Sequence, residues 1–208
     1  MMASSSGHNY TREELQASLG SVGENVSVHR TVQMFSSHHI HLGSNVRIDC
    51  FGLLSAGEEG IYVGDHVHLA AGVYLFGSGG RIVLESFCNL SSRVAVYTAS
   101  DDYTEGYLGN PTVPAKFKKV RQADVILRRH VIVGCGSILL PGTTLGLAAS
   151  VGALSLVNKP VEDFAIVAGI PCRVVGKRGA RVLELEKELL DEKARQKEPD
   201  NASSSSRG

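Results

Sequence analysis

The sequence lacks an excess of either charge, and it lacks a long apolar run. Lysine and arginine together number 21, as do aspartate and glutamate, so net charge gives no reason to expect a nucleic acid partner. No stretch approaches the roughly 20 apolar residues of a membrane-spanning helix, so no span is expected. The chain has 208 residues, of which 43% are hydrophobic. This is enough for one extended core in a single soluble domain.

Paired cysteines and a targeting segment are also missing. Four cysteines are scattered through the chain with no CxxC pair and no regular metal spacing, namely Cys50, Cys88, Cys135 and Cys172. We expect them to be free, buried thiols in a reducing compartment. The N-terminus has no basic segment followed by an apolar one, so the cytoplasm is the expected location.

An aliphatic residue returns every sixth position, in triplets, from Val22 to Val157. The eighteen positions are Val22, Val28, Met34, Leu42, Ile48, Leu54, Val63, Leu69, Leu75, Leu84, Leu90, Val96, Leu127, Val133, Leu139, Leu145, Val151 and Val157. A period of six fits neither an α-helix nor a lone strand, but it does fit three short flat segments per turn of a stacked coil. Extra residues enter only after the third member of a triplet, so we expect every insertion to leave the structure along one edge.

Small residues accompany this repeat. Glycine directly follows six of the eighteen positions, and a small or β-branched residue stands four positions after most of them. Glycine suits a backbone that bends sharply or is closely approached by another chain segment, and small side chains suit a cramped corner.

The pattern resembles that of the hexapeptide-repeat acyltransferases over about two-thirds of the chain. The resemblance is most specific in VIVGCGSILLPGTTLG (Val131–Gly146) and VGALSLVNKPVEDFAIVAGIPCRVVGK (Val151–Lys177), which are similar to galactoside, xenobiotic and lipopolysaccharide-modifying acetyltransferases. It implies an all-β fold, a left-handed parallel β-helix of about six coils. The predicted organisation is a tail and short helix (1–19, helix 11–19), the β-helix (20–176) and a C-terminal helix with a mobile tail (177–208, helix 181–196).

The longest insertion, 97–124, carries the sharpest functional signal. A connection of this length inside a compact repeat is usually functional or disordered, and its four aromatic residues favour an ordered loop. In the family such a loop reaches an adjacent subunit of a homotrimer, and the active site lies between the two subunits.

The resemblance also implies a catalytic histidine at the start of this loop, where this sequence has Ser100. Two interpretations remain open: Asp101 or Asp102 acts as the base, or the acceptor is an amine that needs little help in losing its proton. Adjacent aspartates also cap turns. Ser100, Tyr103 and Lys118 are the predicted substrate contacts, and Lys118 with its basic neighbours would meet a phosphate of a nucleotide sugar or form a solvated face.

Two histidines are further catalytic candidates. His39 lies in the first insertion and His68 in the third coil, although a lone histidine is more often an ordinary surface residue. His66 and His68 lie two apart and share a face of an extended segment, but no third ligand accompanies them, so we predict no metal site.

The resemblance implies a coenzyme A site near the end of the repeat. It carries Cys135, Ala153, Lys159 and Arg173 onto family positions that contact the carrier, with Asn158 a less exact match and Lys177 close by. Small side chains leave the backbone open to the pantetheine arm, and cations meet the phosphate end. The alternative is that small residues merely let the coils stack and that Lys159 is merely exposed.

The leading hypothesis is an acetyl-CoA-dependent sugar acetyltransferase that N-acetylates a nucleotide-linked amino sugar for O-antigen or capsule biosynthesis. O-acetylation of a sugar hydroxyl is the alternative for an enzyme, and a non-catalytic β-helix used for binding or assembly is the alternative from another class. Serine acetyltransferases and tetrahydrodipicolinate succinyltransferases carry large N-terminal domains, for which this chain has no room before the first coil.

Overall fold

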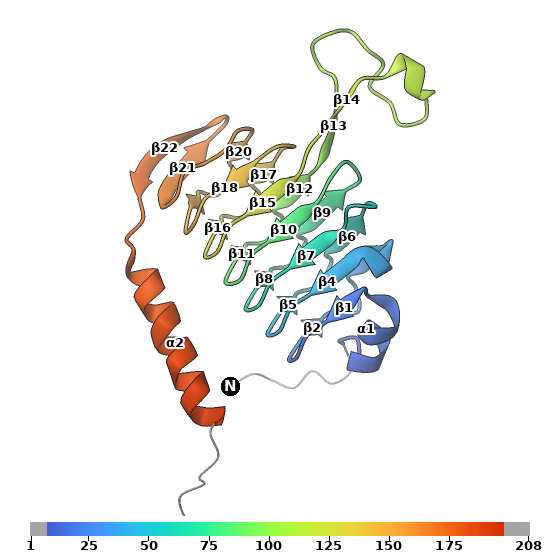
Figure 1. The fold of residues 1–208 in the computed structure, drawn as a ribbon. Helices are drawn as coiled ribbons and strands as arrows, with labels where there is room; N and C mark the ends of the chain where they lie inside the picture. The colour runs from blue at the N-terminus through green and yellow to red at the C-terminus, as the bar shows by residue number, and fades with distance from the viewer. Residues whose placement is uncertain (1–7, 198–208) are drawn as a thin grey trace, which may run out of the picture. The chain divides into compact units, whose positions relative to one another are not determined.

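The structure is a computed structural model that describes residues 8–197. These residues fall into two compact units, divided between Arg178 and Gly179. The first unit is a left-handed parallel β-helix preceded by a short helix (Figure 1). The second unit contains α2 (Arg181–Lys197), the C-terminal helix that its spacing of apolar residues predicts. The predicted mobile tails lie largely outside the described residues.

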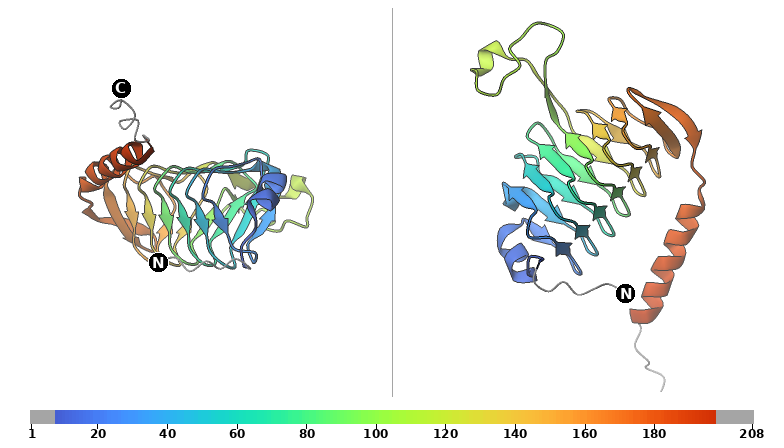
Figure 2. Two further views of the ribbon diagram at one scale, coloured as in Figure 1. Left: turned by 90° about the horizontal axis from the view of Figure 1, so that it is seen from below. Right: turned by 180° about the vertical axis from the view of Figure 1, so that it is seen from behind.

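Three sheets form the walls of the β-helix, and we number them in the order in which the chain meets them. The first sheet contains β1 (Ser21–Val22), β4 (Ile40–Leu42), β7 (Ile61–Val63), β10 (Ile82–Leu84), β15 (Val125–Leu127) and β18 (Thr144–Leu145). The second contains β2 (Ser27–Val28), β5 (Arg47–Ile48), β8 (His68–Leu69), β11 (Asn89–Leu90), β16 (Ile132–Val133), β19 (Ser150–Val151), β21 (Ala165–Gly169) and the antiparallel β22 (Cys172–Lys177). The third contains β3 (Gln33–Phe35), β6 (Leu53–Ala56), β9 (Tyr74–Gly77), β12 (Ala95–Tyr97), β17 (Ile138–Leu139) and β20 (Leu156–Val157). The result is six complete coils and part of a seventh, stacked as Figure 2 shows.

The six-residue repeat sets the register in which the strands of these sheets pair. Leu42 pairs with Val63 in the first sheet, and the equivalent positions of the other coils align in the same way. Of the eighteen repeat positions all are buried except Val22 and Met34, which are partly buried in the first coil. Each column of aliphatic side chains thus points into the prism, as predicted, and supplies most of its core.

The corners between sheets are made by single residues in the left-handed conformation. At the first corner, between the first and second sheets, Asn45, His66, Phe87 and His130 have φ between 57° and 66°. A small inward residue follows each corner, such as the buried Val67 after His66. The second corner joins the second and third sheets, and the third corner returns to the first sheet. Close stacking explains the glycines: a Cβ on Gly134 would lie 2.4 Å from the backbone nitrogen of Ala153.

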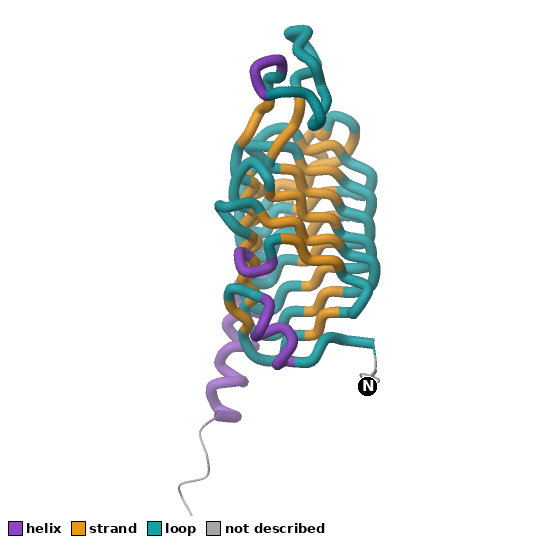
Figure 3. The backbone as a smooth tube through the Cα atoms, turned by 90° about the vertical axis from the view of Figure 1, so that its right-hand side faces the viewer, coloured by secondary structure: helices purple, strands orange, loops and turns teal. Residues whose placement is uncertain are grey.

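Every insertion leaves at the third corner, as predicted. The first holds the 3-10 helix η1 (Ser37–His39). The longest, between β12 and β15, forms an antiparallel hairpin of β13 (Ala99–Asp101) and β14 (Val120–Gln122), with the 3-10 helix η2 (Ala115–Phe117) beyond it. Figure 3 shows this hairpin projecting past the stacked strands. The insertion does not disturb the stacking, because β10 and β15 pair directly across it.

The N-terminal end is covered by α1 (Arg12–Ser18), which begins after Thr11 as predicted. Thr11 and Glu14 form a capping box: the Glu14 backbone N–H donates to the Thr11 hydroxyl, and the Thr11 N–H donates to the Glu14 carboxylate. Leu15 and Leu19 are buried in the core cluster. Neither of the two helices in residues 8–197 has the length and apolarity that a membrane crossing requires.

Candidate active site

Two hollows flank the base of the β13–β14 hairpin. In the hairpin, Ser100 pairs with Arg121 and Asp101 with Val120, which fixes the strands where they leave the third corner. The first hollow has a volume of about 530 Å³ and the second about 640 Å³. Five residues line both hollows, namely Ser100, Asp101, Tyr103, Val120 and Leu140.

The carboxylate of Asp102 is hydrogen-bonded within the loop. Its carboxylate accepts hydrogen bonds from the backbone N–H groups of Thr104 (3.1 Å) and Glu105 (2.8 Å) and from the Thr104 hydroxyl (3.1 Å). Desolvation alone would raise the pKa of Asp102, but these hydrogen bonds outweigh it and hold the pKa below its ordinary value. The turn-capping interpretation therefore describes Asp102, whose use as a base stays a prediction.

Asp101 is the carboxylate of the hairpin that nothing holds. Glu105 forms an ion pair with Lys119, and Asp124 accepts from the backbone and guanidinium of Arg81 at the foot of the loop. Within residues 8–197 the Asp101 side chain has no hydrogen-bond or ion-pair partner, and it faces both hollows. Its geometry is that of a group ready to accept a proton from a bound molecule.

The predicted substrate contacts gather in the first hollow. Ser100, Tyr103 and Lys118 all line it beside Asp101, so a carboxylate, a cation, a phenol and a hydroxyl face one space. Tyr103 is 89% exposed, whereas Lys118 is half-buried. Tyr97 also lines the hollow and stacks on Phe76, with ring centroids 4.8 Å apart. This combination suits a ligand with a flat ring, a phosphate and a polar group.

The predicted carrier residues lie on two different corners. Cys135 and Ala153 occupy equivalent positions of successive coils at the second corner, where the Leu154 N–H donates to the Cys135 carbonyl (2.8 Å). Arg173 pairs with Ala168 at the end of β21 near the same corner. Asn158 follows β20 at the third corner. One face of a single chain therefore carries part of the predicted site on each of its edges.

Lys159 and Lys177 complete this set. Lys159 is exposed next to Asn158 at the third corner. Lys177 pairs with Ala165, at the opposite end of β22 from Arg173, and so lies near the first corner. Lys177 lies four positions after Arg173 on an extended strand, a distance of roughly 13 Å. The structure thus groups Lys177 with neither Arg173 nor Lys159.

Ser92 extends the second-corner column and was missed from the sequence. The Gly136 N–H donates to the Ser92 carbonyl (3.0 Å), which places Ser92 one coil before Cys135. The residue is exposed, and within the described chain its hydroxyl has no hydrogen-bond partner. The long insertion separates the two residues in sequence. The signal that would find Ser92 is that it stands two positions after a repeat leucine, Leu90, as Cys135 stands two after Val133.

Neither candidate histidine reaches the hairpin of its own chain. His39 lies in η1 on the correct corner but three coils away, roughly 14 Å at the usual strand spacing. His68 lies in the second sheet, opposite the third corner, between Asn89 Oδ1 (3.0 Å) and Asp49 Oδ2 (2.9 Å). Their catalytic roles stay predictions. Across residues 8–197 no group of three histidine, cysteine, aspartate or glutamate side chains is placed to bind a metal.

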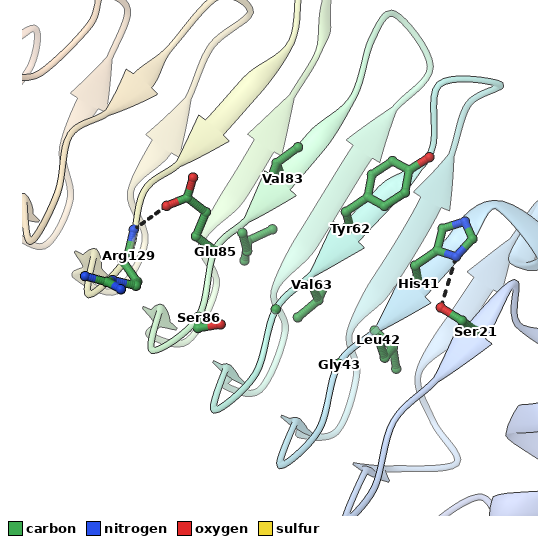
Figure 4. Close-up of a pocket in the computed structure, with 12 residues that line it drawn as sticks. Ser21, His41, Leu42, Gly43, Tyr62, Val63, Val83, Glu85, Ser86 and Arg129 are labelled. Atoms are coloured by element: carbon green, nitrogen blue, oxygen red, sulfur yellow. Dashed lines mark hydrogen bonds between the residues drawn. The ribbon is translucent and has the colours of Figure 1, made fainter. Parts of the chain in front are cut away.

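A third hollow, of about 550 Å³, lies on the outer face of the first sheet, away from the hairpin (Figure 4). His41 stacks on Tyr62 with ring centroids 4.8 Å apart, and its Nδ1 lies 3.1 Å from the Ser21 hydroxyl oxygen. A serine and a histidine at this distance have the residue types of a nucleophile and a base, but in the part of the chain described no carboxylate orients His41. The hollow therefore does not form a catalytic triad.

The cysteines are free, as expected, but they are not all buried. Cys88 and Cys172 are buried, and burial raises the pKa of the Cys88 thiol to about 12. Cys50 is half-buried and Cys135 is exposed, which corrects the expectation for these two. Both stand two positions after a repeat residue, where the second corner turns the side chain outward.

No protein-family model matches the sequence. The chain is 39% identical over 166 residues to dTDP-4-amino-4,6-dideoxy-D-glucose acyltransferase from Escherichia coli, which covers 80% of this chain and 86% of the relative. It belongs to the hexapeptide-repeat sugar acyltransferases. The predicted family membership is thereby confirmed.

Solved structures agree with this membership. The N-acyltransferase AntD from Bacillus cereus, in complex with dTDP and 3-hydroxybutyryl-CoA, is 37% identical and superposes with a TM-score of 0.84 over 90% of this chain and 98% of AntD. A variant of AntD has been solved with dTDP-4-amino-4,6-dideoxyglucose and coenzyme A, at 36% identity and the same TM-score over 89% of this chain. Among hexapeptide-repeat acyltransferases, this chain thus resembles members that bind nucleotide-linked sugars.

Proposed function

We propose that this protein transfers an acetyl group from acetyl-CoA to the amino group of a nucleotide-linked amino sugar. The observation that carries the proposal is the unpaired carboxylate of Asp101 in a hollow formed by a loop without histidine. A sugar hydroxyl needs a strong base in the transition state, whereas an amine needs only to lose one proton. The name of the Escherichia coli relative and the ligands of AntD support an amino-sugar acceptor.

The reaction then needs few groups from the protein. The Asp101 carboxylate takes one proton from the sugar ammonium group, and the free amine attacks the carbonyl carbon of the thioester. A C–N bond forms and the C–S bond breaks. The nitrogen loses its second proton, which passes to the departing thiolate of coenzyme A, and Asp101 releases the first proton to solvent. Structures of AntD include variants with one aspartate replaced by alanine or asparagine, which supports an aspartate as the group of interest in that relative.

Binding of the two substrates follows from the charges and small residues described above. Lys118 faces the diphosphate of the nucleotide sugar, and Tyr97 offers its ring to the base. Arg173 and Lys159 meet the phosphates of coenzyme A. The pantetheine arm runs along the second-corner column, past Ala153 and Cys135 toward Ser92, where small side chains expose the backbone.

The split of the carrier residues supports a homotrimer with active sites between subunits. Cys135, Ala153 and Arg173 lie at one edge of the third sheet, and Asn158 and Lys159 at the other. One coenzyme A molecule contacts both groups if the second corner of one copy faces the third corner of the next. That arrangement also brings the hairpin of the second copy to the thioester.

Light scattering tests the assembly, and mixing tests the shared site. We expect chains carrying Asp101→Asn to be nearly inactive alone, and chains carrying Arg173→Ala to be about tenfold less active alone when acetyl-CoA is well below saturation. Refolded together, the two are expected to regain activity under the same conditions, because some sites then receive two intact contributions. Activity that stays low in confirmed mixed trimers contradicts a site shared between subunits.

The test of the function is release of the coenzyme A thiol by purified protein with acetyl-CoA and a panel of acceptors. Nucleotide-linked amino sugars are expected to support release, and the matching nucleotide sugars with a hydroxyl in place of the amine serve as controls. Release with the hydroxyl compounds alone contradicts N-acetylation. We further propose that the reaction takes place in the cytoplasm as a step in O-antigen or capsule assembly, which fractionation and deletion of the gene test.

A further inference from the structure

Leu140 stands between the two halves of the candidate site. Among the residues that line both hollows, Ser100, Asp101, Tyr103 and Val120 belong to the hairpin, and Leu140 alone belongs to the coils. It is half-buried, immediately after β17 at the third corner. Its side chain is therefore held by the rigid stack of coils rather than by the loop.

The sheet register fixes what lies on either side of Leu140. Val96 pairs with Leu139, so Tyr97 lies one coil before Leu140. Leu139 pairs with Val157, and the Leu140 N–H donates to the Val157 carbonyl (2.9 Å), so Asn158 lies one coil after it. Figure 1 shows the three strands involved, β12, β17 and β20, stacked in this order. Successive coils are about 4.8 Å apart.

This order has a direct chemical meaning once the proposed function is accepted, on which the inference rests. The thioester arrives from the side of Asn158, and the amine is held on the side of Tyr97 and Asp101. The acyl carbon must lie between them to be attacked. The tail of the acyl group then lies against the coil residue at that level, which is Leu140.

We propose that Leu140 is a specificity-determining residue that forms the apolar wall of the acyl site and limits the length of the acyl group. A leucine side chain next to an acetyl methyl excludes water and fills the space that further methylenes need. Removing it opens room for a longer linear acyl group, and enlarging it closes the site to all but the smallest. AntD, which binds 3-hydroxybutyryl-CoA, shows that acyl length varies among similar proteins.

The test compares acetyl-CoA with butyryl-CoA for the wild type, Leu140→Ala and Leu140→Phe, both by turnover with an amino-sugar acceptor and by calorimetric affinity. One methylene in an apolar pocket changes kcat/KM by roughly 10- to 200-fold. We expect Leu140→Ala to raise the butyryl-to-acetyl ratio at least about tenfold, and Leu140→Phe to lower it by a similar factor. Calorimetry needs no acceptor, so it reports on the acyl site even if the acceptor is misassigned.

Ile138 provides the matched control. It lies in the same coil, is 39% exposed and lines neither hollow. Ile138→Ala is expected to leave both ratios unchanged. If the protein binds both thioesters but neither Leu140 variant moves either ratio, the inference is wrong and the proposed function stands. If acyl-CoA binding is normal and no amino sugar is acylated, the proposed function fails, and the affinity ratios still decide the role of Leu140. A protein that binds neither thioester overturns both.

Discussion

Asp101→Asn is the substitution that most directly tests the proposed chemistry. Asparagine has the shape of aspartate but cannot accept a proton, and Asp101 has no partner among residues 8–197 whose loss would disturb the loop. General-base catalysis by a positioned side chain contributes roughly 10²- to 10⁴-fold. An amine acceptor can also lose its proton to water, so we expect the lower end of this range, a fall in kcat of about 100-fold with little change in KM.

The adjacent aspartate supplies the control. Asp102→Asn replaces one of the two carboxylate oxygens that accept from the Thr104 and Glu105 N–H groups with an NH2 group, and it leaves Asp101 in place. Because it disturbs the shape of the loop and not the proton transfer, we expect a raised KM for the acceptor and a smaller effect on kcat. Both variants are assayed by thiol release under saturating acetyl-CoA.

The pH dependence separates a base from a binding residue. As the pH rises toward the pKa of the sugar amine, the free amine becomes abundant without help, so the defect of Asp101→Asn is expected to shrink. A variant with unchanged kcat at every pH, or a constant defect from acid to alkaline pH, would refute the assignment of Asp101 as the proton acceptor.

Four further predictions concern other parts of the chain. Lys159→Ala and Arg173→Ala are each expected to weaken acetyl-CoA binding about tenfold in calorimetry because each removes a charge-assisted contact to phosphate, whereas Lys177→Ala, near another corner, is expected to change it little. Gly134→Ala places a Cβ 2.4 Å from backbone and is expected to cost about 1–3 kcal/mol of stability, seen as a drop in Tm, with Gly176→Ala, whose Cβ has 3.6 Å of clearance, as control. Native protein is expected to label with a thiol reagent at the exposed Cys135 and not at Cys88. Burial raises the pKa of Cys88 from its ordinary value of 9.0 to about 12, so unfolding releases a proton in this pH range, and Tm is expected to decline as the pH rises from 9 toward 12.

The coils could be predicted from the sequence because their determinants are local and repeated. Each repeat residue points inward for the same reason as its equivalent one coil away, and the spacing alone aligned Val96 with Leu139 across the long insertion. The capping box at Thr11 and Glu14 is equally local, and the helix predicted over 11–19 differs from α1 by one residue at each end.

The site was harder to predict because it depends on which contacts are already satisfied. Asp101 and Asp102 are identical neighbours in sequence, but the loop donates hydrogen bonds to the carboxylate of Asp102 and none to that of Asp101. Ser92 and Cys135 are distant in sequence and adjacent in space. Lys159 and Arg173 lie at opposite edges of the third sheet. This separation depends on where the chain turns its corners, and the family motif does not show the corners.

Because β10 pairs directly with β15, the insertion between β12 and β15 can vary in length without changing the stack of coils. Arg128 and Glu85 meet across a separation of 43 residues, about twice the 21 residues that separate the partners Asp65 and Ser86 in neighbouring coils. Doubling a loop adds only about 0.6 kcal/mol of closure entropy. The hairpin segment can therefore be lengthened or shortened at almost no thermodynamic cost to the scaffold. New acceptor sugars can be selected in the loop while the stack of coils continues to present the same acyl donor.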